Sequence, residues 1–186
     1  MRVKLISLLF VFFLFTGCKN TNLPLENAMA LRENITKSNG CAFLSTVTAD
    51  YGEKVYTFSM ECRTDKEGNM TFTVTQPVTL DGITGKIDTA GGAITFDDKV
   101  LAFQSIADGQ VTPVTAPWLL IKTLRSGYLR DCTETEKGYR ISIDDSYEED
   151  ALRLQIYVES DSPVAGEIYW KGRRILTLTV ENFTYL

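Results

Sequence analysis

Cys18 is the residue of this chain whose surroundings point most directly to covalent chemistry. It follows the most apolar stretch of the sequence, Leu5 to Phe15, which itself follows a short positive start at Arg2 and Lys4. The apolar stretch is too short to span a bilayer, which takes roughly 20 apolar residues. Its length and flanks are typical of a secretory signal peptide. We therefore predict a signal peptide over residues 1–17.

Small residues lead directly into that cysteine. Thr16-Gly17-Cys18 resembles the lipobox of bacterial lipoproteins, with Phe15 where leucine is commonest. The resemblance implies that the Cys18 thiol receives a diacylglyceryl group and that the chain is cut before Cys18. Residues 18–23 then form an acylated tether, and each buried methylene contributes about 0.8 kcal/mol to membrane anchoring. The alternative is an ordinary signal peptide with a chance cysteine.

The resemblance places the mature protein in the bacterial cell envelope. It implies attachment to the outer face of the cytoplasmic membrane. In a cell with two membranes, Lys19 rather than aspartate after the anchor implies transfer to the outer membrane.

The composition excludes several classes of function. The chain has no histidine, which rules out a Ser-His-Asp triad, a Cys-His pair and histidine metal ligands within it. Its formal net charge of −5 disfavours nucleic-acid binding, which needs a basic face. An enzyme that uses two carboxylates would need them close together in one cleft, and nothing in the sequence indicates such a pair. We predict no enzyme, no metal and no cofactor.

Two charged segments have ordinary structural interpretations. The segment Asp144 to Asp150 holds five carboxylates but lacks the spacing and the glycine of an EF-hand loop, so we predict a solvated acidic turn. The segment Lys171 to Arg174 lies beside Trp170 and is predicted to be a hairpin tip. Contact of this basic tip with lipid headgroups or a partner protein is the alternative.

Apolar spacing predicts the elements of one domain over residues 24–186. Helical spacing predicts an amphipathic helix over 24–37 and a shorter one over 117–127. Alternation and turn residues predict strands over 41–49, 54–63, 70–76, 83–88, 93–96, 100–103, 130–135, 139–143, 152–159, 164–170 and 174–184. A sheet of about ten strands curls, and a curled sheet must be filled. The predicted class is α+β, an incomplete antiparallel β-barrel whose hollow is filled or covered by the N-terminal helix and the short inserted helix.

The first two strands have a specific predicted register. If Tyr51-Gly52 is a two-residue loop, Cys41 lies opposite Cys62 and Phe43 opposite Met60, all on one face. A Cys41–Cys62 disulfide is compatible with this arrangement. Two reduced, buried thiols are favoured, because directly opposed cysteines strain a disulfide and Cys132 would remain unpaired.

Several segments together resemble the LolA/LolB superfamily of lipoprotein carriers, with its LppX/LprG-type lipoprotein relatives. They are the opening helix around Leu25–Ile35, the stretch AITFDDKVLAF, the inserted APWLLIKTL and the ending SPVAGEIYWKGRRILTLTVENFTYL. The resemblance implies an incomplete barrel, covered by helices, whose apolar hollow takes up acyl chains. LolA-type carriers use an arginine in the early strands, and the one here is Arg63, at a strand end.

The predicted function follows from this resemblance and from the apolar face of the sheet. We expect a membrane-anchored, monomeric lipoprotein that binds, carries or senses a lipid or lipid-modified molecule. The alternative is a filled-core module that recognises another envelope protein through a strand edge or its loops. The predicted ligand-binding residues are Phe43, Phe58, Met60, Phe72, Val74, Trp118, Leu120 and Ile121.

Overall fold

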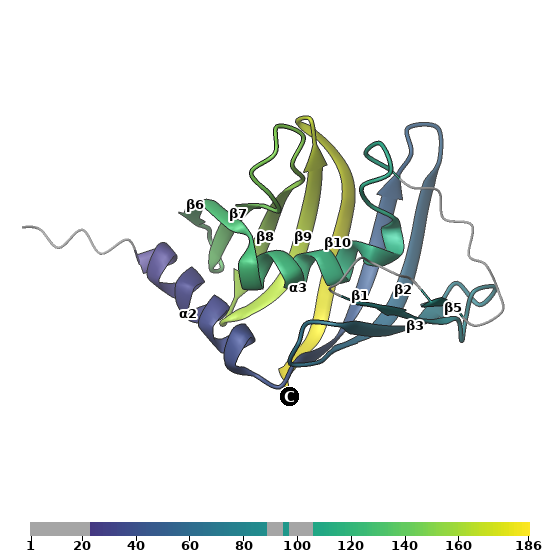
Figure 1. Ribbon diagram of the computed structural model, residues 1–186, viewed down its shortest axis with the longest axis horizontal. Helices are drawn as coiled ribbons and strands as arrows, with labels where there is room; N and C mark the ends of the chain where they lie inside the picture. The colour runs from purple at the N-terminus through teal and green to yellow at the C-terminus, as the bar shows by residue number, and fades with distance from the viewer. Residues whose placement is uncertain (1–22, 89–94, 97–105) are drawn as a thin grey trace, which may run out of the picture.

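The first and last strands of the chain are neighbours at the centre of one antiparallel sheet (Figure 1). The structure is a computed structural model that describes residues 23–88, 95–96 and 106–186. Cys18 and the predicted strand 100–103 lie outside the described residues, as do residues 93 and 94 of the predicted strand 93–96. Within the described residues the sheet has ten strands in the order β5-β4-β3-β2-β1-β10-β9-β8-β7-β6. The edge strands of this order, β5 and β6, do not pair with each other, so the described sheet is an open barrel. This confirms the predicted fold class.

The helices and strands have nearly the bounds that the sequence predicts. The helices are α2 (Leu23–Lys37) and α3 (Ala116–Ser126), with the short 3-10 helix η2 (Pro113–Thr115) before α3. The first five strands are β1 (Cys41–Asp50), β2 (Val55–Thr64), β3 (Met70–Gln76), β4 (Thr84–Ile87) and β5 (Thr95–Phe96). The second five are β6 (Tyr128–Glu134), β7 (Tyr139–Asp144), β8 (Arg153–Glu159), β9 (Ser162–Trp170) and β10 (Arg173–Tyr185).

The predicted register of β1 and β2 is wrong by two residues. The loop has four residues, closed by a hydrogen bond from the Tyr51 amide to the Lys54 carbonyl, so Asp50 pairs with Val55 and Phe43 with Cys62. A shift of two leaves every side chain on its predicted face, because side chains alternate with a period of two.

The corrected register separates the two cysteines that were predicted to face each other. Cys41 now neighbours Thr64, whose hydroxyl accepts a hydrogen bond from the Cys41 amide at 2.9 Å. Cys41, Cys62 and Cys132 are all free thiols. The structure therefore has the reduced alternative rather than the Cys41–Cys62 disulfide.

Helix α3 lies across the inner face of the sheet (Figure 1). From the middle of the sheet outwards it packs against β1, β10, β8 and β7. Leu120, Ile121 and Leu124 are its largest fully buried side chains. Gly166 of β9 makes room for the helix, since a Cβ there would lie 2.9 Å from Leu120 Cδ1.

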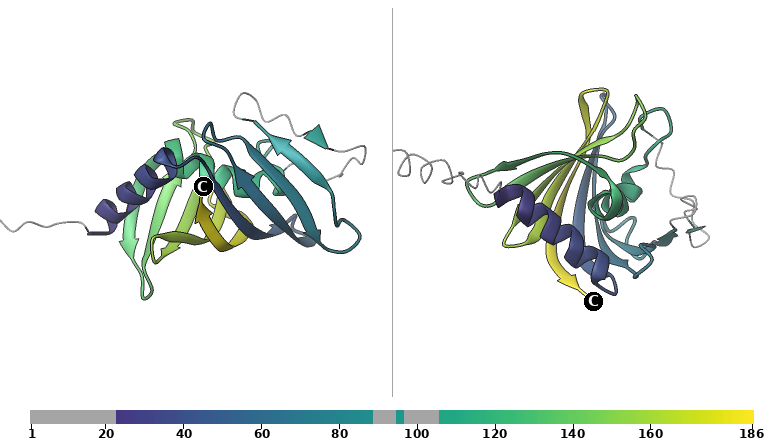
Figure 2. Two further views of the ribbon diagram at one scale, coloured as in Figure 1. Left: turned by 90° about the horizontal axis from the view of Figure 1, so that it is seen from below. Right: turned by 60° about the vertical axis from the view of Figure 1, so that its left-hand side comes forward.

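Helix α2 packs beside α3, over the half of the sheet that holds β6 and β7 (Figure 2). Ala28, Leu31 and Ile35 recur at helical spacing and are buried on that side. Helix α2 therefore covers the part of the inner face that lies beyond the C-terminal end of α3.

Candidate functional site

The eight residues predicted to bind ligand all belong to the core beneath α3. Seven of them are at most 4% exposed: Phe43, Phe58, Met60, Phe72, Val74, Leu120 and Ile121. Trp118 is partly buried against the same core. The structure thus brings all eight together and fills the space between them with side chains. Their role in ligand binding stays a prediction.

Two side chains of α3 donate hydrogen bonds to the loop between β2 and β3. Trp118 Nε1 donates to the Gly68 carbonyl at 3.1 Å, and Arg125 Nη2 donates to the Lys66 carbonyl at 2.7 Å. Both acceptors lie in the loop between β2 and β3. No strand pairing runs through α3, so the hydrogen bonds of the β-ladder do not depend on the helix.

Arg32 of α2 joins the two helices. Its Nε donates to the Leu124 carbonyl and its Nη2 to the Gly127 carbonyl, both at 2.8 Å. These carbonyls belong to the last turn of α3, where backbone acceptors lack partners within the helix. Burial lowers the pKa of the Arg32 guanidinium. The sequence offers no signal for this contact beyond an arginine on an amphipathic helix.

A surface cavity opens where α2, the end of α3 and the β6–β7 pair meet. Its volume is about 320 Å³. It is lined by Arg32, Gly127, Tyr128, Leu129, Arg130, Asp144, Ser146, Tyr147 and Glu148. The rings of Tyr128 and Tyr147 lie against each other at its side. We call this cavity the arginine cavity.

A buried carboxylate forms the base of the arginine cavity. The Asp144 side chain is 6% exposed and accepts from Arg130 Nε at 2.5 Å and from Arg153 Nε at 2.8 Å. Burial raises the pKa of the Asp144 carboxyl, but hydrogen bonds from Arg153 and Arg130 outweigh it and hold the pKa below its usual value. Asp144 is the first residue of the segment predicted to be a solvated acidic turn. For this residue the prediction is wrong: Asp144 is buried, and its ion pairs with Arg130 and Arg153 offset the cost of burying its charge.

An apolar seam continues inward from the arginine cavity, between α2 and the sheet. It is lined by Ala28, Met29, Arg32, Leu124, Leu129, Ile141 and Ile143, and it leaves no room for water. Met29 is 50% exposed at its outer side. The seam and the arginine cavity share Arg32 and Leu129.

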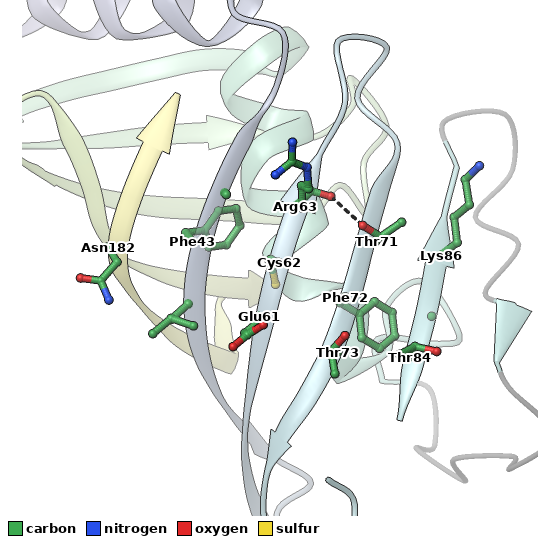
Figure 3. Close-up of a pocket in the computed structure, with 13 residues that line it drawn as sticks. Phe43, Glu61, Cys62, Arg63, Thr71, Phe72, Thr73, Thr84, Lys86 and Asn182 are labelled. Atoms are coloured by element: carbon green, nitrogen blue, oxygen red, sulfur yellow. Dashed lines mark hydrogen bonds between the residues drawn. The ribbon is translucent and has the colours of Figure 1, made fainter. Parts of the chain in front are cut away.

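A second, open groove of about 710 Å³ crosses the outer face of the sheet (Figure 3). Its floor is the backbone of β1 to β4, with Leu44, Glu61, Arg63 and Lys86 along it. The register shift between β1 and β10 puts Asn182, at φ 54°, beside the groove. Most of its lining residues are outward positions of ordinary alternating strands, which give no signal in the sequence. The buried residues Phe43, Cys62 and Phe72 also belong to the lining, and Phe43 and Phe72 are among the predicted ligand-binding residues.

The basic tip Lys171 to Arg174 is engaged within its own fold. Lys171 Nζ lies 4.1 Å from the centroid of the Trp170 ring and 3.6 Å from Asp108 Oδ2. Arg174 pairs with Glu167 at 2.7 Å. These contacts agree with the predicted hairpin tip.

Metal ligation and membrane crossing have no structural feature among the described residues. No group of three or more cysteine, aspartate or glutamate side chains there could hold a metal ion. No helix in residues 23–88, 95–96 and 106–186 is both long and apolar enough to cross a membrane.

Comparison with known proteins gives structural neighbours alone. No protein-family model matches the chain, and no curated protein matches it. An uncharacterized conserved protein from Thermus thermophilus is similar over 87% of this chain and 86% of its own, with 12% identity and a TM-score of 0.44. A LolA superfamily protein from Nitrosomonas europaea is similar over 84% and 92%, with 8% identity and a TM-score of 0.39.

A third neighbour is a protein solved with a partner. MucB in complex with MucA(peri) is similar over 88% of this chain and 56% of its own, with 13% identity and a TM-score of 0.37. At these scores no function passes from a neighbour to this chain, and function rests on the geometry described above.

Proposed function

We propose that this chain is a bacterial envelope lipoprotein that takes up an apolar ligand between α3 and the inner face of its sheet. The ligand is a lipid or a lipid-modified molecule. Residues 1–17 are the signal peptide, Cys18 carries the acyl anchor, residues 18–23 are the tether and residues 24–186 are the binding domain. The protein acts as a monomer and carries out no covalent chemistry.

The observation that carries this proposal is the way α3 covers the inner face. The helix contributes an apolar side to the core, yet it belongs to no strand and is held at its rim by side-chain hydrogen bonds. Moving it would expose apolar inner-face positions of the strands it contacts, β1, β7, β8 and β10, among them Leu178. Acyl chains that replace the helix on this surface are stabilised by roughly 25 cal/mol per Å² of apolar area removed from water.

The first test is native mass spectrometry of the mature chain with Cys18→Ser, purified without detergent. We expect a co-purifying lipid or stoichiometric uptake of a fluorescent fatty-acid analogue. A ligand-free mass together with no uptake of the probe would contradict the proposal.

A cross-link tests whether α3 must move. The double variant Leu120→Cys, Gly166→Cys introduces one thiol on α3 and one on β9 at their contact. A Cβ on Gly166 would lie 2.9 Å from Leu120 Cδ1, and this Cδ1 is two bonds from the Leu120 Cβ. A disulfide needs Cβ atoms about 3.5–4.5 Å apart. We expect the oxidised form to exclude the probe and the reduced form of the same protein to bind it. Equal uptake by both forms would show that ligand does not enter beneath α3.

The second candidate function is recognition of another envelope protein. The filled core and the open groove on the outer face of β1 to β4 favour it. It predicts no lipid uptake, and it predicts that Arg63→Glu in the groove abolishes binding to the partner while the fold is unchanged.

A further inference from the structure

The arginine cavity and the apolar seam meet at two residues. Arg32 and Leu129 line both of them, one from α2 and the other from β6. The cavity is polar and open to solvent, and the seam is closed and, apart from Arg32, apolar. The seam leaves no room for water, so a chain can enter it only as α2 moves away from the sheet, and a molecule that then occupies both has a polar head and an apolar chain.

The arginines of the cavity have donors that the protein does not use. Arg130 employs its Nε for Asp144, and Arg32 employs Nε and Nη2 for the end of α3. Among the described residues nothing accepts a hydrogen bond from Arg32 Nη1 or from either Nη atom of Arg130. Guanidinium groups match the planar, charged oxygens of carboxylate and phosphate.

The backbone of β6 directs Arg130 to this place. The pairing of β6 with β7 shifts between Leu129 and Asp131, which makes Arg130 the extra residue of a β-bulge. Bulges re-aim side chains and are common beside binding sites. The side chain thereby reaches Asp144 and stays 61% exposed in the cavity.

The charged side chains in and around the cavity allow an anion to bind there. Arg130 and Arg153 both pair with the buried carboxylate of Asp144, and Arg32 lines the same cavity. Glu148 also lines the cavity, on an exposed loop. Within the lining, the guanidinium groups of Arg32 and Arg130 face these two carboxylates, and Arg153 adds a third guanidinium to Asp144 from outside the lining.

We infer that the apolar ligand is an anionic amphiphile, whose head group binds Arg32 and Arg130 in the arginine cavity and whose chain enters the seam between α2 and β6–β7. This inference rests on the proposed function. It names the chemical class of the ligand and an entry beside α2, from which the seam leads to Leu124 of α3. A carboxylate and a phosphate head group share the required chemistry.

The test compares chains of equal length with different heads on the mature protein with Cys18→Ser. Isothermal titration measures dodecyl phosphate, dodecanoate, dodecanol and inorganic phosphate. We expect the two anionic amphiphiles to bind about tenfold or more tightly than dodecanol, as a charge-assisted hydrogen bond predicts. Inorganic phosphate alone should bind far more weakly than dodecyl phosphate, because it lacks the chain.

Matched arginine variants locate the head group. Arg130→Gln should lower the affinity for dodecyl phosphate about tenfold and leave the affinity for dodecanol unchanged. The variant should fold, since Arg153 still pairs with Asp144. Arg140→Gln removes the same charge from an outward position of β7 and should change neither of these two affinities. Thermal melting of both variants verifies that they fold.

Each other outcome has a distinct meaning. Equal affinity for dodecanol and dodecyl phosphate would overturn the inference and leave the proposed function standing. Equal affinity for inorganic and dodecyl phosphate would reduce the cavity to a simple anion site and overturn it as well. Failure of every chain-bearing ligand to bind would overturn both the inference and the proposed function.

Discussion

Leu120 of α3 lies directly over Gly166 of β9, where a side chain would collide with it. A Cβ on Gly166 would lie 2.9 Å from Leu120 Cδ1 and 3.0 Å from Leu178 Cδ2. The absence of a side chain at this one position of the sheet therefore determines how closely the helix approaches the inner face.

Gly166→Val should push α3 away from the sheet. Overpacking of this kind costs about 1–3 kcal/mol of unfolding free energy. Urea unfolding measures the loss, and increased binding of a hydrophobic dye would report the exposed inner face. Ala165→Val, at the adjacent position on the opposite face, is the control and should change stability by less. Unchanged stability of Gly166→Val would mean that α3 does not pack at this distance.

Asp144→Asn should destabilise the protein by about 1–3 kcal/mol at neutral pH, because the amide loses the negative charge and one of the two acceptor oxygens that Arg130 and Arg153 use. The folded pKa of Asp144 lies below its unfolded value of about 3.9. Its contribution is therefore complete above pH ~4 and is lost as the pH falls through the folded pKa. The stability difference between wild type and Asp144→Asn should shrink over that range.

The control for this pH dependence is Glu149→Gln, in the same acidic segment but exposed. It should follow the wild-type curve at every pH. A constant gap between wild type and Asp144→Asn from neutral pH down to pH 2 would contradict a carboxylate stabilised by Arg130 and Arg153.

The thiols should react slowly with an aromatic disulfide reagent at pH 8. Burial raises the pKa of Cys41 and Cys62 above that of a free thiol, and it raises the pKa of Cys132 to about 11. Because the thiolate is the reactive form, we expect slow labelling of half-buried Cys132 first. Cys41 and Cys62 should label only as the protein unfolds. Mass spectrometry showing a Cys41–Cys62 bridge in the native protein would contradict the free thiols.

Acylation of Cys18 can be tested in a bacterial host supplied with labelled palmitate. We expect the wild-type chain to incorporate the label and to fractionate with membranes, because two or more acyl chains give stable anchoring. Cys18→Ser should incorporate none. Cys132→Ser is the control and should be labelled as wild type, and an unlabelled wild type would contradict the predicted anchor.

The sequence by itself determined the elements and their faces. Helical spacing placed α2 within one residue of its observed bounds, and period-two alternation put Phe43, Met60 and Phe72 on the buried side. These are local properties, because alternation of apolar residues follows directly from which side of an element meets water. The fold class follows from the same pattern, since a long curled sheet with one apolar face needs helices to cover it.

Only the tertiary structure decided which of these residues meet. The β1–β2 register depends on the conformation of a four-residue turn, and a shift of two leaves the alternation pattern intact. Whether the hollow is filled depends on how closely α3 can approach Gly166. The arginine cavity joins Arg32, Arg130 and Asp144 from three separate elements. Periodicity reports which side of an element is buried, whereas contacts between distant elements depend on packing and chain topology, which no local pattern encodes.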